Sequence, residues 1–249
     1  MDPTDSFDFG APSDPPCLFL HGFTGSPAEL RPLAERVARE GYRVVGPRLP
    51  GHGLGASDLT TAGASDWIRA AGGALRSLEK PAHVVGLSMG ALVAVRLAAS
   101  EPSAVRSLGL LAPAVRLKGI ARPTAWVLRR VPALYRRWPS VPWPTTSDVH
   151  DPAMAGINPK NPRLSLFGMA ELSRLQAGVF TDARRVAAPA LVVLGKLDRT
   201  ICNFAARRLA RALSAEIEVA PRSGHQLGMD YDREAVAAHL LALFRRAER

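Results

Sequence analysis

The chain has 249 residues, of which 47% are hydrophobic and 22% are charged, and its formal net charge is +10. This composition is typical of a folded globular protein and excludes global disorder, and the length fits one α/β domain with an insertion. No stretch of the sequence approaches the roughly 18–20 consecutive apolar residues that a membrane-spanning helix needs.

The first sixteen residues carry four aspartates and no lysine or arginine. A secretory signal needs a basic start followed by an apolar stretch, so the sequence predicts a loose acidic tail over residues 1–16 and a cytoplasmic protein. Cys17 and Cys202 are the only cysteines. Two cysteines so far apart in the sequence do not indicate a disulfide framework or a metal site.

From residue 18 onward, apolar runs of the β type alternate with longer amphipathic stretches. The pattern predicts strands at 18–20, 42–46, 82–86, 107–111, 190–194 and 216–220. It predicts helices at 27–40, 65–78, 90–100 and 233–246. Strands and helices alternate in this way in the α/β class, where a mainly parallel sheet is covered by helices on both faces.

The alternation stops once, between residues 114 and 185. This segment contains Pro-rich turns and short helical pieces but no β-like run. About seventy residues is too long for an ordinary connection between two strands. We therefore expect residues 114–185 to form an inserted helical cap at the carboxyl edge of the sheet, with 17–113 and 186–249 forming the core.

The strongest local motif is Gly86-Leu87-Ser88-Met89-Gly90, which lies between a predicted strand and a predicted helix. A serine at such an elbow is held in a strained turn with its hydroxyl exposed, and the flanking glycines avoid collisions with neighbouring backbone. Chance alone gives on the order of 0.1 occurrences of this pattern in a chain of this composition. The motif predicts that Ser88 is a nucleophile.

A serine hydroxyl needs a base to remove its proton, and the base needs a carboxylate to orient it. The expected chain order in a sheet of this kind is serine, acid, histidine, each after a strand. Among the histidines that follow Ser88, only His225 lies in a loop directly after a strand, so it is the predicted base. Asp198, directly after the strand at 190–194, is the predicted acid. Asp182 precedes that strand, and later aspartates follow His225.

Acyl transfer also needs donors for the negative oxygen of the tetrahedral intermediate. One expected donor is the backbone N–H of Met89, the residue after the nucleophile, and the other is the N–H of Phe23 in the glycine-rich loop after the first predicted strand. That loop lacks the lysine of a phosphate-binding Walker loop and the spacing of a dinucleotide fingerprint. No metal-ligand cluster stands out either, so the sequence predicts neither a cofactor nor a metal.

Taken together, these motifs resemble those of the α/β-hydrolases, and within them the bacterial carboxylesterases and monoacylglycerol lipases. The similar stretches are HGFTGSP at 21–27, RLPGHG at 48–53, DW at 66–67, GLSMG at 86–90 and GHQLGMDYD at 224–232. The resemblance implies an α/β-hydrolase fold with a small cap over an apolar tunnel, and the triad and oxyanion donors given above.

The function expected from this resemblance is hydrolysis of carboxylic esters with apolar acyl chains, through an acyl-enzyme on Ser88. The same triad serves thioesterases, acyltransferases and carbon–carbon bond hydrolases, so these remain alternatives. A non-catalytic binding role is disfavoured because Ser88, Asp198 and His225 occur in the required order.

Between residues 114 and 147 the sequence has seven basic residues, no acidic one and three tryptophans. One interpretation of this stretch is a solvated cationic face whose tryptophans pack the cap onto the core. Another interpretation is a surface that contacts anionic lipid. We expect no nucleic-acid partner, because no nucleic-acid-binding motif accompanies the charge.

Overall fold

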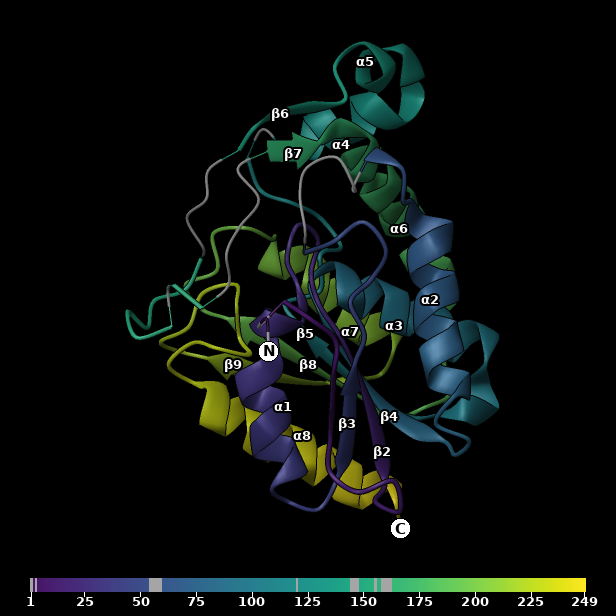
Figure 1. Ribbon diagram of the computed structural model, residues 1–249, viewed down its shortest axis with the longest axis vertical. Coiled ribbons are helices and arrows are strands. Elements are labelled where there is room, and N and C mark those ends of the chain that lie inside the picture. The colour runs from purple at the N-terminus through teal and green to yellow at the C-terminus, as the bar shows by residue number, and fades with distance from the viewer. Residues whose placement is uncertain are drawn as a thin grey trace.

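A seven-stranded sheet lies at the centre of the computed structural model (Figure 1). The structure describes residues 2, 4–53, 60–119, 121–143, 148–154, 156–157 and 163–249, and only the backbone of 121–123. From edge to edge the strands are β1 (Phe7–Phe9), β3 (Arg43–Gly46), β2 (Pro16–Leu20), β4 (Ala82–Leu87), β5 (Val105–Leu111), β8 (Ala190–Gly195) and β9 (Glu216–Ala220). All neighbours are parallel except β1, which pairs antiparallel with β3.

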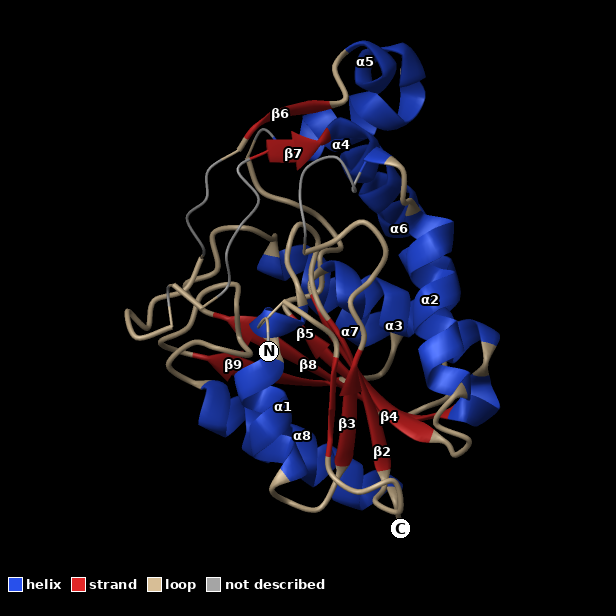
Figure 2. Ribbon diagram, in the orientation of Figure 1, coloured by secondary structure: helices blue, strands red, loops and turns tan. Residues whose placement is uncertain are grey.

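Helices cover both faces of this sheet (Figure 2). On one face lie α1 (Arg31–Ala38) and α8 (Arg233–Ala247), which pack against each other. On the other lie α2 (Ala64–Arg76), α3 (Met89–Ser100) and α7 (Asn203–Ala212). The described part of the core also contains the short 3₁₀ turns Pro27–Glu29 and Pro102–Ala104. The prediction of an α/β fold with a mainly parallel sheet covered on both faces is confirmed.

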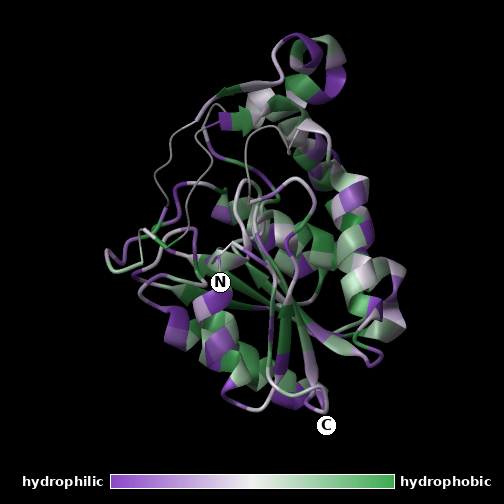
Figure 3. Ribbon diagram, viewed as in Figure 1, coloured by the Kyte–Doolittle hydropathy of each residue, from purple (hydrophilic) through white to green (hydrophobic). Residues whose placement is uncertain are grey.

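The centre of the sheet is buried from both sides, because its strands and the helix behind them are almost entirely apolar. All six residues of β4 are buried, and α3 is built mainly from small and aliphatic residues that are also buried. A helix that is apolar on most of its circumference belongs in the interior. Figure 3 shows the hydrophobic residues concentrated on the central strands. Ser88 lies in the turn between β4 and α3, within this buried centre.

The segment from 114 to 185 connects β5 to β8, which are neighbours in the sheet. It contains α4 (Ala121–Arg130), α5 (Pro132–Arg137), β6 (Ser140–Pro142), β7 (Arg163–Ser165) and α6 (Leu166–Ala183). In Figure 1, α4, α5, β6 and β7 lie at the top, far from the C-terminus. The expectation that this segment lacks strands is wrong, because β6 and β7 pair antiparallel. Its role as a cap stays a prediction.

The N-terminal segment also differs from the prediction of a loose tail. Residues 7–9 form β1, and Phe7 is only 5% exposed. The Phe7 ring stacks on Phe9, with ring centroids 4.9 Å apart, and fills the space beside Gly46, where a Cβ would lie 2.2 Å from the ring. The alternation of Phe7, Asp8 and Phe9 is a short signal for an edge strand with one buried face.

No helix in the described part of the chain is long and apolar enough to cross a membrane. The cytoplasmic location stays a prediction.

Candidate active site

Ser88 lies at the turn between β4 and α3, with φ of 56° and ψ of −110°. A non-glycine residue at positive φ is strained and persists only when its surroundings hold it. Here the Ser88 N–H donates to the Leu111 carbonyl at 2.9 Å, and the Ser88 carbonyl accepts from the Ala114 N–H at 3.1 Å. Both flanking glycines are required, since a Cβ on Gly86 or Gly90 would lie 2.3 Å or 2.1 Å from a backbone oxygen.

His225 and Asp198 meet beside this turn. The distance between His225 Nδ1 and Asp198 Oδ2 is 2.8 Å. The other carboxylate oxygen, Oδ1, accepts the N–H groups of Thr200 at 2.7 Å and Ile201 at 2.9 Å. Because the carboxylate accepts from Nδ1, the Nε2 atom of a neutral His225 carries the free lone pair that a general base needs.

The surroundings of Asp198 keep its carboxyl group ionised. Burial opposes ionisation, but the charge of His225, its hydrogen bond and the two backbone N–H groups outweigh burial, so the pKa of Asp198 lies below its ordinary value. An ionised carboxylate at this place stabilises the imidazolium that forms when His225 accepts a proton.

The loop after β2 is held by a buried histidine. His21 Nε2 accepts the Leu49 N–H at 3.0 Å, so the ring proton lies on Nδ1, which donates to the Gly22 carbonyl at 2.9 Å. The N–H and C=O of a trans peptide point in opposite directions, and the described chain has no cis peptide bond. Fixing the Gly22 carbonyl therefore fixes the direction of the Phe23 N–H.

The two predicted oxyanion donors take different places. Phe23 lines the same cavity as Ser88 and His225. Met89 is fully buried behind Ser88 and is the first residue of α3. The N–H groups in the first turn of a helix have no partner within the helix and carry its positive partial charge. Both positions thus suit a donor to a negative oxygen that forms near Ser88.

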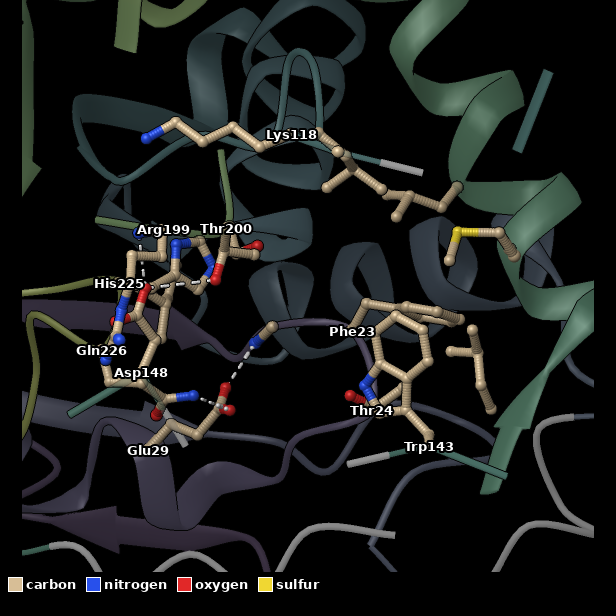
Figure 4. Close-up of a pocket in the computed structure, with 18 residues that line it drawn as sticks. Phe23, Thr24, Glu29, Lys118, Trp143, Asp148, Arg199, Thr200, His225 and Gln226 are labelled. Carbon is tan, nitrogen blue, oxygen red and sulfur yellow. Dashed lines mark hydrogen bonds and ion pairs between the residues drawn. The ribbon is translucent and has the colours of Figure 1, made fainter. Parts of the chain in front are cut away.

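The cavity has a volume of about 400 Å³ and two unlike sides. In Figure 4, polar and charged side chains gather on the side of His225, and Phe23 and Trp143 lie on the other. The apolar lining is completed by Leu87, Leu117, Leu164, Met169 and Leu172, the last three from β7 and α6. A site of this kind can hold an acyl chain at one end and a polar leaving group at the other.

Two aspartates that sequence reasoning did not assign hold the histidine loop. Asp230 accepts the Gly224 N–H at 2.8 Å. The Asp148 carbonyl accepts the His225 N–H at 3.1 Å, and its side chain accepts the Arg199 N–H at 2.7 Å. Asp230 lies in the histidine motif, where chain order excluded it as the acid. Nothing local in the sequence marks Asp148.

Two further polar residues at the cavity wall, Glu29 and Gln226, were also not assigned from the sequence. His52, in contrast, holds the loop that follows β3. Its Nδ1 lies 3.0 Å from the Pro50 carbonyl, and its ring packs edge-on against Phe23 and Trp67. Burial lowers the pKa of His52 to about 3, so its ring is neutral.

The sequence is similar to those of known proteins. A family model described as "Alpha/beta hydrolase family" matches residues 17–239. The thermostable monoacylglycerol lipase of Bacillus sp. (strain H-257) is 30% identical over 234 residues, which are 91% of this chain and 89% of that protein. The carboxylesterase of Bacillus subtilis (strain 168) is 30% identical over 93 residues, 36% of this chain and 38% of that protein.

Solved structures show the same likeness. A metagenome-derived lipolytic enzyme superposes with a TM-score of 0.87 at 26% identity, over 99% of each chain. The monoacylglycerol lipase of Paleococcus ferrophilus superposes with a TM-score of 0.79 at 19% identity, over 96% of this chain and 98% of that one. Because the family model spans most of the sequence and a 30% identical relative is covered almost throughout, the chain belongs to the alpha/beta hydrolase family.

Proposed function

We propose that the protein hydrolyses carboxylic esters with apolar acyl chains through an acyl-enzyme on Ser88. The observation that carries this proposal is the placement of Ser88 and His225 in one cavity with an apolar wall, with His225 bonded to Asp198. Its relatives named monoacylglycerol lipase and carboxylesterase support ester hydrolysis.

The proposed reaction has two halves. In the first, His225 takes the Ser88 proton while Ser88 Oγ attacks the ester carbonyl carbon, and the N–H groups of Phe23 and Met89 donate to the resulting oxyanion. His225 then gives its proton to the leaving alcohol. In the second half, His225 deprotonates a water molecule that attacks the acyl carbon, and the acid leaves as Ser88 regains its proton. Asp198 orients the imidazole throughout.

The variant Ser88→Ala tests this function. With a series of p-nitrophenyl esters of increasing chain length, the variant should lose at least about 10³-fold in kcat, because it has no nucleophile. Wild type should react with a fluorophosphonate at one site per chain, and the variant should not. Full esterase activity of a folded Ser88→Ala variant would falsify the proposal.

A wider set of substrates distinguishes ester hydrolysis from the other reactions that use a serine nucleophile. A panel with an ester, a thioester, an amide and a β-diketone of equal acyl length ranks carboxylesterase, thioesterase, amidase and carbon–carbon hydrolase activity. An added alcohol acceptor reveals acyl transfer. We expect the ester to react fastest.

We also propose that the basic segment of the insertion contacts anionic lipid. Trp126 and Trp138 are 53% and 54% exposed, so the expectation that they pack the insertion onto the core is wrong for both. Arg130 and Arg137 lie over their rings, at 4.0 Å and 5.4 Å from the ring centroids. Exposed tryptophan beside arginine is typical of surfaces that enter the interface of a membrane. Vesicle co-sedimentation tests this contact.

A further inference from the structure

Glu29 is a buried carboxylate at the wall of the catalytic cavity that the proposed reaction does not use. It is the last residue of the 3₁₀ turn Pro27–Glu29 and is 1% exposed. Burying a carboxylate is unfavourable unless hydrogen bonds compensate for lost water. The partners of Glu29 therefore indicate what the residue does.

Its two carboxylate oxygens accept hydrogen bonds from two different loops. Oε2 accepts the Gly22 N–H at 2.9 Å, and Oε1 accepts from Gln226 Nε2 at 2.9 Å (Figure 4). Gly22 directly precedes Phe23, the proposed oxyanion donor. Gln226 directly follows His225, the proposed base. One side chain thus joins the two loops that carry these groups.

Each of the two loops also places a glycine closely against Glu29. A Cβ on Gly25 would lie 2.2 Å from the Glu29 carboxyl carbon, and a Cβ on Gly228 would lie 2.5 Å from the Glu29 backbone oxygen. At distances this short, a residue larger than glycine would displace the Glu29 carboxylate at position 25 or the backbone at position 228. The sequence of both loops is therefore compatible with a close contact around Glu29.

The contact with Glu29 determines the orientation of the Gln226 side-chain amide. This side chain is 2% exposed. The amide turns its NH₂ group toward Glu29, since Nε2 donates to Glu29 Oε1 and an NH₂ group is the donor of an amide side chain. In the part of the chain that the structure describes, Gln226 Oε1 is buried and has no hydrogen-bond partner. The amide is thus held by Glu29, and rotation of the amide would break no hydrogen bond of Oε1 to a described group.

We propose that Glu29 is a positioning residue, which holds the oxyanion loop and the histidine loop at a fixed separation through Gly22 and Gln226. The inference rests on the proposed function, since it assigns Glu29 to the same reaction. In the proposed reaction the carbonyl oxygen of the ester must lie at the Phe23 N–H while His225 lies within reach of Ser88 and the leaving alcohol. A displacement of about 1 Å between such groups can cost about 10²-fold in rate. We call the two hydrogen bonds from Gly22 and Gln226 to Glu29 the Glu29 bridge. Loss of this bridge should therefore raise the energy of the transition state more than it weakens substrate binding.

The variant Glu29→Ala removes both hydrogen bonds. It should lower kcat for a p-nitrophenyl ester by about 10- to 100-fold and change KM much less. Glu29→Gln should retain more activity, because its amide oxygen can accept the Gly22 N–H and a rotated Gln226 can accept from its NH₂ group. The matched control is Glu35→Ala, since Glu35 lies on the solvent side of α1 with only a 3.9 Å ion pair to Arg39. It should behave as wild type.

Exchanging the side chains of Glu29 and Gln226 distinguishes loss of the contact between them from a general loss of structure. Gln226→Glu alone places two buried carboxylates together and should lower kcat at least as much as Glu29→Ala. Adding Glu29→Gln restores an amide facing a carboxylate, and the oxygen of the introduced amide accepts the Gly22 N–H. The double variant should recover at least about 5-fold in kcat over Gln226→Glu, a coupling in the range measured for contacting residues.

Two results would overturn the proposal: a folded Glu29→Ala variant with the kcat of wild type, or a double variant no faster than Gln226→Glu. Melting temperatures verify that each variant is folded at the assay temperature. Hydrogen exchange of the Gly22 amide should be faster in Glu29→Ala than in wild type and unchanged in Glu35→Ala. This readout tests the bridge without ester hydrolysis, so inactivity of wild type, which would refute the proposed function, is distinguishable from failure of the bridge.

Discussion

Asp198, the proposed acid, is expected to orient His225 and to contribute to the stability of the fold. Replacing it by asparagine should lower kcat by about 10³- to 10⁴-fold, because the amide favours the wrong imidazole tautomer. Ester hydrolysis by Asp198→Asn measures this loss. Activity close to that of wild type would contradict the assignment of Asp198 as the acid, and Asp230 would then be the next residue to test.

The pH dependence of stability gives a second measurement on the same residue. The pKa of Asp198 is lower in the folded chain than in the unfolded chain, where it is about 3.9. Its stabilising contribution is therefore fully present above about pH 4 and is lost as the pH falls through the folded value. Urea unfolding should show a larger difference between wild type and Asp198→Asn at about pH 7 than at about pH 3. Equal differences would contradict the lowered pKa.

Single residues could be predicted from the sequence where a short motif specifies them. Ser88, His225 and Asp198 each follow a strand in a fixed order. In the structure Ser88 and His225 line one cavity and His225 contacts Asp198, while their catalytic roles stay a prediction. Glu29 and Asp148 could not be found in this way. Glu29 binds Gln226, which is 197 residues away, and Asp148 binds Arg199, which is 51 residues away, and no local pattern encodes a contact between such distant loops.

Secondary-structure elements were predictable where burial is complete on both faces. The central parallel strands appear as continuous apolar runs, and such runs have a strong signal. The elements that the sequence analysis did not predict are the strands β1, β6 and β7, which have only three residues each, and the helix α7. A run of three residues contains too few positions to show a period of two.

The edge strand β1 is expected to stabilise the fold. Phe7→Ala should lower the free energy of unfolding by about 3 kcal/mol, because the ring is buried beside Gly46 and leaves a cavity when removed. Asp8→Ala is the matched control, since Asp8 lies on the opposite side of β1 in a surface pair with Arg43, and such pairs contribute about 0–1 kcal/mol. Denaturation by urea measures both. Equal effects of the two variants would favour a loose tail.

The distribution of charge over the entire chain gives the last test. Residues 114–185 contain twelve basic and four acidic residues, so this segment carries +8 of the net charge of +10. Within it, α4 and α5 contain five arginines and no acidic residue, and they lie at the far end of the molecule from α8 (Figure 1). The exposed Trp126 of α4 and Trp138, directly after α5, lie beside arginines. Charge gathered at one end orients a protein toward an anionic surface, and each arginine near such a surface contributes about 1 kcal/mol.

Vesicles containing phosphatidylglycerol should therefore bind the protein more tightly than vesicles of phosphatidylcholine alone, and added salt should weaken the binding. The double variant Arg136→Glu/Arg137→Glu should bind the anionic vesicles at least about 10-fold more weakly, with unchanged hydrolysis of a water-soluble ester. The control Arg207→Glu/Arg211→Glu makes the same change of net charge on exposed positions of α7. Co-sedimentation compares the two variants. If both lose the same affinity, binding depends on net charge alone, and the insertion is not the contact surface.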